Sequence, residues 1–321
     1  MSSSRSRLNK LLFPAASDTW LTLLRLGLGT EVTLYCLSLH RDWLQLFRSN
    51  GNGIISRDLS EAVLSAQSRF VPRLGWLVQV GGEMGLSEDA IIRTIWLLLL
   101  CAGCFVLIGF FSRCAAVAAW FLHLCAIESG NLMTYGMDNF TTIGLFYLML
   151  APLPDRYALD YRKAKCPRKN HCLLGLFKRI LQLHLCLIYF FSGLAKSIGF
   201  GWWNGTSFWC SLTSPPYNTI PVSVLASLAP LLPVLGIGVW ALEIGYPIFI
   251  WLRKTRLMWF LAIIAMHMAI ALTMGLYLFA FVMIVLNLAA FGPDVLPLLN
   301  KITLSAADAP AREPDLIRVT E

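Results

Sequence analysis

Charged residues are scarce in this sequence. Only 14% of the 321 residues are Asp, Glu, Lys or Arg and 57% are hydrophobic, whereas soluble domains average about a quarter and about half. This shortage excludes an ordinary soluble globular protein. Apolar runs of about 20 residues, enough to cross the roughly 30 Å hydrocarbon layer of a bilayer, recur along the chain. The sequence therefore predicts an all-α integral membrane protein with little structure outside the bilayer.

Three further signals are missing. The basic N-terminus runs into Trp20 without the apolar core and cleavage site of a signal peptide, so we expect no removable signal. No HxxxH or HxxE spacing accompanies His123 or His184, so we expect packing roles for both and no metal site. The CxxC pair Cys101 and Cys104 lies inside an apolar run without the context of a redox motif, so we expect no disulfide framework.

The apolar runs predict a bundle of about eight transmembrane helices with additional interfacial helices. The third and fourth runs are short, so they are expected to borrow flanking polar residues or to lie inside the bundle. Leu74–Val80 and Val222–Ala229 are expected at the membrane surface. The predicted spans are Leu21–Leu39, Ile91–Phe111, Cys114–Ile127, Asn139–Leu153, Ile180–Lys196, Leu231–Leu252, Leu257–Met274 and Leu276–Phe291.

The net charge of +8 comes from short basic clusters between the apolar runs. With eight spans all these clusters fall on one side of the membrane, while the segment 197–222 on the other side lacks Lys and Arg, so both termini are predicted to be cytoplasmic. The predicted organisation is a cytoplasmic segment 1–19, a transmembrane domain 20–292 and a cytoplasmic tail 293–321. Membrane lipids explain the basic clusters better than nucleic acid, which is not an expected partner.

Ionisable residues inside a span are costly and mark a structural pair or a functional site. Arg25 and Glu31 are six residues apart in the first span, so they do not face each other and we expect partners elsewhere. Glu243 lies near Pro247, where a helix kink would free a backbone group for the carboxylate, and structural and functional roles stay equally open. His267 lies mid-span among small residues, where packing is the better interpretation of the histidine alone.

The strongest cluster is IYFFSGLAKSIGFGWWNGTSFWC, in which Lys196 is the sole charged residue between Arg179 and Glu243. One interpretation is a lysine that reaches the outer interface beside an ordinary belt containing Trp202 and Trp203. The other is a partly desolvated amine in an aromatic pocket, available as a general base for a phenolic proton.

A second polar segment lies between the third and fourth predicted spans, on the same side as Lys196. It carries Tyr135, Asp138 and Asn139. Acidic, amide and amine groups from two separate segments would thus meet at one face of the bundle, which predicts a site at the membrane surface.

Four stretches resemble the HTTM (horizontally transferred transmembrane) domain family, which includes the membrane part of vitamin K-dependent gamma-carboxylase. They are YFFSGLAKSIGFGWWNG, GMDNFTTIGLFYLMLAP, MHMAIALTMGLYLFAFVM and the TLLRLGLG opening with Arg25. The resemblance implies that Lys196 is the base that deprotonates a reduced, vitamin K-like quinone, with His267 nearby, in carboxylase- or epoxidase-like chemistry. It implies substrate or quinone binding by Asp138, Asn139, Tyr189, Trp202, Trp203, Asn204 and Glu243.

Carboxylases of the full-length type carry a large external domain after the last span, whereas this sequence ends soon after it, so glutamate carboxylation is less expected than the fold. Short HTTM proteins also resemble the membrane component of a bacterial peptide-toxin maturation system. That similarity implies an exported peptide substrate or a separately encoded subunit, in a bacterial inner membrane. Two other classes stay open: a noncatalytic assembly or escort protein, which would tolerate Lys196→Arg, and a transporter.

Overall fold

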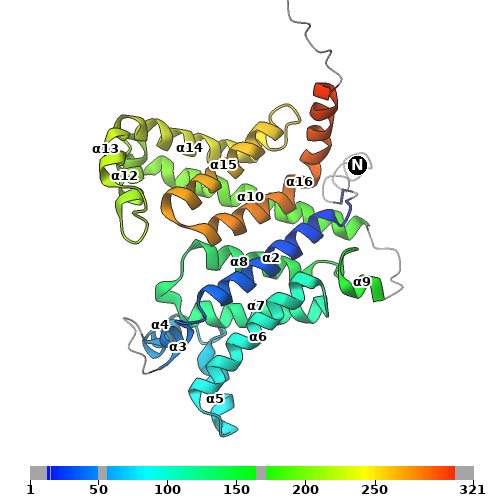
Figure 1. The fold of residues 1–321 in the computed structure, drawn as a ribbon, viewed down its shortest axis with the longest axis vertical. Helices are drawn as coiled ribbons and strands as arrows, with labels where there is room; N and C mark the ends of the chain where they lie inside the picture. The colour runs from blue at the N-terminus through cyan, green and yellow to red at the C-terminus, as the bar shows by residue number, and fades with distance from the viewer. Residues whose placement is uncertain (1–12, 15, 50–55, 164–170, 308–321) are drawn as a thin grey trace, which may run out of the picture.

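The computed structural model describes residues 13–14, 16–49, 56–163 and 171–307, and these residues form helices and connections without a strand. Two groups of long helices make up the molecule (Figure 1). One group contains α2 (Thr19–Ser38), α6 (Glu88–Ile108), α7 (Ser112–Ser129) and α8 (Gly136–Leu150). The other contains α10 (His171–Ile198), α14 (Leu232–Phe249), α15 (Arg256–Met274) and α16 (Tyr277–Ala307).

Helix α2 joins the two groups because it packs against both α6 and α16. Its residues Leu21, Leu24, Leu28 and Val32 are fully buried and recur at the three- and four-residue spacing of one helix face. Gly29 brings α6 close, since a Cβ at this position would lie 2.5 Å from the Leu107 backbone nitrogen. Helix α2, which carries the buried Arg25 and Glu31, therefore lies in the middle of the bundle.

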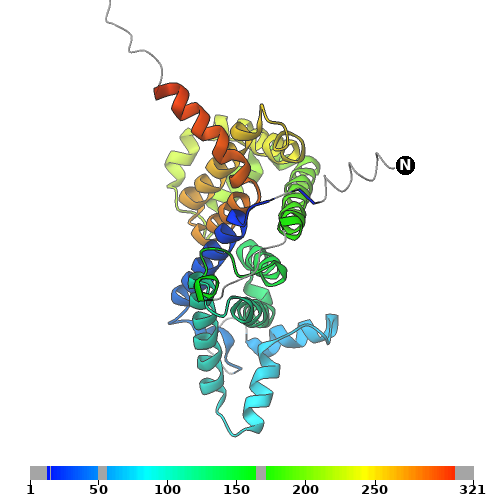
Figure 2. The same cartoon turned by 90° about the vertical axis from the view of Figure 1, so that its right-hand side faces the viewer.

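Short helices occupy the ends of the bundle. Figure 1 places α9 at one end and α12 and α13 at the other, and Figure 2 shows α4 and α5, in light blue and cyan, projecting from the side of the long helices. Their bounds are α3 (Trp43–Phe47), α4 (Arg57–Gln67), α5 (Leu74–Glu83), α9 (Leu159–Lys163), α11 (Phe200–Trp203), α12 (Thr206–Thr213) and α13 (Val222–Ser227), with 3-10 turns η1 (Asn131–Met133) and η2 (Ala229–Leu231).

Five of the described helices are long and apolar enough to cross a membrane, which supports a membrane protein. They are Glu88–Ile108, Cys172–Ile198, Ala229–Phe249, Arg256–Met274 and Tyr277–Pro297. The prediction of eight spans is confirmed only in part. Helix α8 has 15 residues and α2 carries Arg25 and Glu31, so spans at α2, α7 and α8 remain predictions.

Two boundaries differ clearly from the predicted spans. Helix α10 begins at His171 rather than Ile180, and α16 continues to Ala307 rather than ending at Phe291. Pro293 and Pro297 lie inside α16, where each removes one backbone donor without ending the helix. The basic residues in segments 1–12 and 164–170, whose predicted location is cytoplasmic, lie outside the described residues.

Arg25 holds three parts of the chain together. Its Nε atom lies 2.5 Å from Asp155 Oδ2, and its Nη1 atom donates to the carbonyl oxygens of Val106 and Leu107 at the C-terminal end of α6. Thr22 also donates to Asp155, at 2.8 Å. The expectation of a structural partner elsewhere is therefore confirmed for Arg25, whereas the Glu31 carboxyl oxygens have no hydrogen-bond partner among the described residues.

The Asp155 carboxyl group lies in the connection after α8 and is fully buried. Burial alone would raise the pKa of this carboxyl group, but hydrogen bonds and charge from Arg25, with further hydrogen bonds from Thr22 and the Tyr157 N–H, hold the pKa below its ordinary value. The ionised form is thus part of the folded structure.

We expect Asp155→Asn to lower the free energy of unfolding by about 3 to 5 kcal/mol, because it leaves the Arg25 charge buried and unpaired. Since the folded pKa is depressed, the stabilisation is complete above the unfolded value of about 3.9 and disappears as the pH falls through the lower folded value. Denaturant unfolding in detergent at several pH values measures both effects.

The matched control is Asp89→Asn, which breaks the exposed Arg48–Asp89 ion pair, whose side chains are 45% and 35% exposed. Its cost should not exceed about 1 kcal/mol. Equal costs for the two substitutions would contradict the structural role of Arg25.

Candidate functional site

One face of α10 carries polar residues toward the end of the bundle that bears α12. Tyr189, Ser192 and Lys196 recur at i, i+3 and i+7, which places them on the same side of a helix. Gly193 lets α14 approach closely, since a Cβ there would lie 2.9 Å from the Ile244 backbone nitrogen. The polar face of α10 is therefore held against the face of α14 that carries Glu243.

Lys196 and Glu243 form an ion pair between these helices. Lys196 Nζ donates to Glu243 Oε2 at 2.7 Å and to Ser192 Oγ at 2.8 Å. The two charged side chains are 16% and 8% exposed, and the ammonium lies 5.0 Å from the centre of a Trp202 ring. Glu243 thus binds Lys196 instead of a backbone group freed at Pro247.

Further aromatic side chains stand beside this ion pair. Trp240 donates to Ser197 Oγ at 2.7 Å, and its ring centre lies 5.0 Å from that of Trp203. Trp203 is 38% exposed. Asn204 is exposed and accepts a hydrogen bond from the Thr206 N–H, so its side chain stabilises the local turn and does not contact the ion pair.

Deeper in the bundle, Tyr189 and His267 meet as part of a buried network. His267 Nε2 lies 2.8 Å from the Tyr189 hydroxyl, and Asn287 Nδ2 donates to the same hydroxyl and to the Met283 carbonyl. The hydroxyl of Tyr246 donates to Asn287 Oδ1. The structure therefore connects Tyr189 with His267, and connects Lys196 with Glu243 and Trp202.

The hydrogen-bond network favours one of the two tautomers of the neutral His267 ring. The Met283 carbonyl can only accept, which fixes the orientation of the Asn287 amide. The Tyr189 hydroxyl accepts from that amide, and donation to His267 Nε2 is the arrangement that gives the hydroxyl's one hydrogen a partner. The neutral ring then carries its hydrogen on Nδ1, an atom that is buried and has no hydrogen-bond partner among the described residues.

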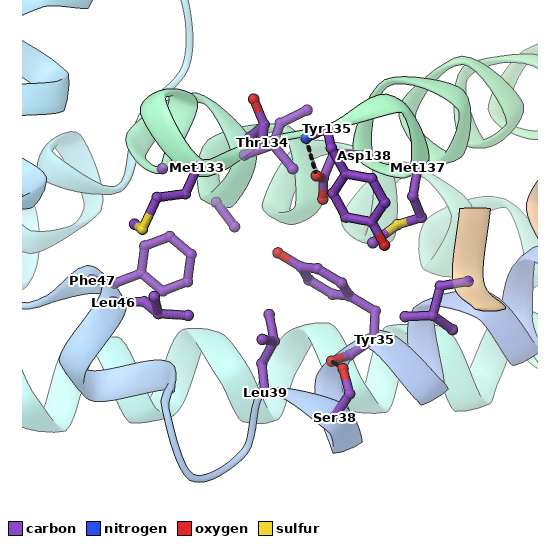
Figure 3. Close-up of a pocket in the computed structure, with 14 residues that line it drawn as sticks. Tyr35, Ser38, Leu39, Leu46, Phe47, Met133, Thr134, Tyr135, Met137 and Asp138 are labelled. Atoms are coloured by element: carbon purple, nitrogen blue, oxygen red, sulfur yellow. Dashed lines mark hydrogen bonds between the residues drawn. The ribbon is translucent and has the colours of Figure 1, made fainter. Parts of the chain in front are cut away.

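Asp138 and Asn139 lie elsewhere. Asp138 lines a separate cavity between the ends of α2, α7 and α8 (Figure 3), and Asn139 is exposed. No hydrogen bond, ion pair or ring contact of the described residues joins either residue to Lys196. The residues predicted for one site are thus divided among the ion pair, the buried network and this cavity, and Asn139 and Asn204 belong to none of them.

Sequence reasoning missed Ser192, Tyr246 and Asn287. An amide inside an apolar run was a usable signal for Asn287, since such a group needs partners from neighbouring helices. His123 and His184 bond the hydroxyls of Thr142 and Tyr147, as a packing role predicts.

The ion pair is suited to proton exchange with a lipid-soluble molecule. In an ammonium–carboxylate pair the carboxylate can accept a proton as the ammonium shifts its hydrogen bond to the negative charge that forms nearby. The neighbouring helix surface is apolar and open, since Ile198 and Phe200 are 83% and 77% exposed. Among the described residues, no group of three or more His, Cys, Asp or Glu side chains is arranged to hold a metal ion.

Comparisons with known proteins add no relative: no family model matches the chain, and no match was found among curated proteins or solved structures. The resemblance to the HTTM family therefore stays a prediction.

We expect the Lys196–Glu243 pair to show strong coupling. Glu243→Gln should lower the free energy of unfolding by about 2 kcal/mol because it leaves a partly buried ammonium without its carboxylate, and adding Lys196→Met should restore most of the loss. A double-mutant cycle in denaturant measures the coupling. Glu83→Gln on the exposed surface of α5 is the control, and additive effects of the two substitutions would show that the pair does not form.

We expect ¹⁵N NMR of labelled His267 to show a hydrogen on Nδ1 and an unprotonated, hydrogen-bonded Nε2. Tyr189→Phe removes the donor and should produce a mixture of both tautomers. A ring protonated on Nε2 in the unsubstituted protein would contradict the network.

Proposed function

We propose that this chain is a membrane-embedded enzyme that uses the Lys196–Glu243 pair to remove a proton from a reduced, lipid-soluble quinone. The observation that carries the proposal is the buried ion pair itself, at 2.7 Å, beside Trp202 and an apolar surface. The pair supplies a proton acceptor and a positive charge where a phenolic molecule can arrive from the lipid.

Glu243 and Lys196 have different roles in the proposed proton transfer. Glu243 receives the proton on its carboxylate, and the Lys196 ammonium, held by Ser192 at 2.8 Å, keeps its positive charge beside the reacting oxygen. Trp202 offers a flat ring against which an aromatic molecule can lie. This assignment differs from a lysine acting alone, because the hydrogen bond from Lys196 to Glu243 makes the carboxylate part of the base.

The site fits a reduced quinone on the chemistry of its groups. The charged pair can interact with a phenolic hydroxyl, and the Trp202 ring can pack against an aromatic body. The exposed Ile198 and Phe200 can contact an isoprenoid tail. When bound, a reduced quinone supplies a hydroxyl whose deprotonation prepares the ring to react with oxygen. Tyr189 lies deeper on the same face of α10 as Lys196, and its hydrogen bond to His267 links α10 to α15.

The finer topology belongs to the same proposal. With α2, α7 and α8 also crossing, the chain has eight spans, both termini are cytoplasmic and Lys196 lies near the outer surface. The positive-inside distribution of Lys and Arg supports this orientation. A bacterial inner membrane, and an exported peptide or a separately encoded subunit as the partner that uses the chemistry, are carried only by the resemblance to the HTTM family.

A noncatalytic assembly protein is the second candidate, because an ion pair between helices is also a structural tie. The chain contains a comparable tie: Lys178 Nζ on α10 lies 2.7 Å from Asp294 Oδ1 on α16. Lys178 is thus a natural control for Lys196, since both are lysines on α10 paired with a carboxylate of another helix.

The test is to purify the protein with native lipids, identify any extracted quinone, and measure oxygen consumption with a short-chain reduced menaquinone. We expect activity in the unsubstituted protein, a loss of about 100-fold or more in Lys196→Ala and Glu243→Gln, and near-normal activity in Lys178→Ala. If Lys196→Ala retains quinone but consumes little oxygen, Lys196 is needed for the reaction and not for quinone binding.

Absence of both quinone and oxygen consumption in the unsubstituted protein would overturn the enzymatic proposal. Equal losses in Lys178→Ala and Lys196→Ala would point to the assembly role, in which both lysines act as ties.

A further inference from the structure

A cavity of about 280 Å³ lies among the ends of several helices, away from Lys196. Its walls come from the last turns of α2 and α7, from α3, from the start of α8 and from Leu278 on α16. Figure 3 shows the side chains of Tyr35, Phe47, Tyr135 and Asp138 around it. The volume is at the small end of ligand sites, which suits a compact molecule.

The Tyr35 hydroxyl is the first feature of the cavity that suits a hydrogen-bonding ligand. The residue is only 6% exposed, yet no hydrogen bond to its hydroxyl occurs among the described residues, although the ring packs against Trp43 and His123. Figure 3 shows the hydroxyl directed into the cavity. Because the hydroxyl points into the cavity and bonds no described residue, it is available to hydrogen-bond a ligand there.

The electrostatics of the cavity favour a cation. Asp138, 5% exposed, lines the wall. Glu31 lies one turn before Tyr35 on α2 and interacts electrostatically with the Asp138 carboxyl group. Glu31 is fully buried and both its carboxyl oxygens lack hydrogen-bond partners among the described residues.

The helix ends and the rings add to this preference. The C-terminal ends of α2 and α7, which carry partial negative charge, both border the cavity and outnumber the N-terminal end of α8, which carries partial positive charge. None of the described lining residues is Lys or Arg. Rings of Tyr35, Tyr135 and Phe47 stand in the wall, and the faces of aromatic rings attract cations. Metal ions are a poorer match, because thioethers, rings and aliphatic side chains make up most of the remaining wall.

We infer that this cavity binds a small organic ammonium ion, whose N–H groups bond Asp138 and the Tyr35 hydroxyl while its carbon body lies against the aromatic rings. The site is independent of the Lys196–Glu243 pair. The ligand inferred here is an organic cation, a class different from the quinone proposed for the ion pair.

Three probes of matched shape test the charge preference: phenethylamine, phenethyl alcohol and phenylacetate, each titrated calorimetrically into the purified full chain at neutral pH. The expected order is binding of the amine, at least tenfold weaker binding of the alcohol, equivalent to about 1.4 kcal/mol, and no binding of the anion. Equal binding of the alcohol, preferred binding of the anion, or binding of none of the three would overturn the inference.

Two substitutions locate the site. Asp138→Asn keeps an oxygen that can accept from the Tyr135 N–H, a bond present at 3.0 Å, and Tyr35→Phe keeps the ring. Each should weaken the amine at least fivefold, whereas Glu128→Gln, an equal charge change on α7 outside the lining, should leave it within twofold. Unchanged affinity in both cavity variants, in folded protein, would contradict the assigned site.

Discussion

Arg25, Lys178 and Lys196 each have a partner from another part of the chain, because an isolated charge inside an apolar bundle costs several kcal/mol. Arg25 meets Asp155 and two carbonyls of α6, and Lys178 meets Asp294. Lys196 meets Glu243. These contacts decide which helices lie side by side, since the apolar surfaces of helices in lipid have little preference for one another.

The groups left without partners are equally informative. Glu31 and His267 Nδ1 are buried and without a hydrogen-bond partner among the described residues, as are Trp20 Nε1, Arg57 Nε and His123 Nε2. The Tyr35 hydroxyl points into the cavity and has no hydrogen bond to a described residue. Glu31 and Tyr35 share one face of α2 and stand at or beside a cavity. At the cavity, these two unbonded groups support the ligand site inferred there.

The sequence was sufficient for the long elements and insufficient for their partners. Apolar length predicted the five helices that can cross a membrane, because crossing imposes a minimum length on each run separately. Asp155 was not singled out, because it lies in a connection 130 residues from Arg25 and its burial depends on tertiary packing. Lys196 and Glu243 were both singled out, but their pairing depends on Gly193 letting α14 approach, a contact between helices that no periodicity reveals.

The central claim is that Glu243, held by Lys196, receives a proton from the substrate. Infrared difference spectroscopy on adding short-chain reduced menaquinone measures this directly, through the C=O band of a protonated carboxyl group. The account predicts that the band appears in the unsubstituted protein and in Lys178→Ala but not in Glu243→Gln. A band of equal size in Glu243→Gln, or no band in the unsubstituted protein, would contradict the claim.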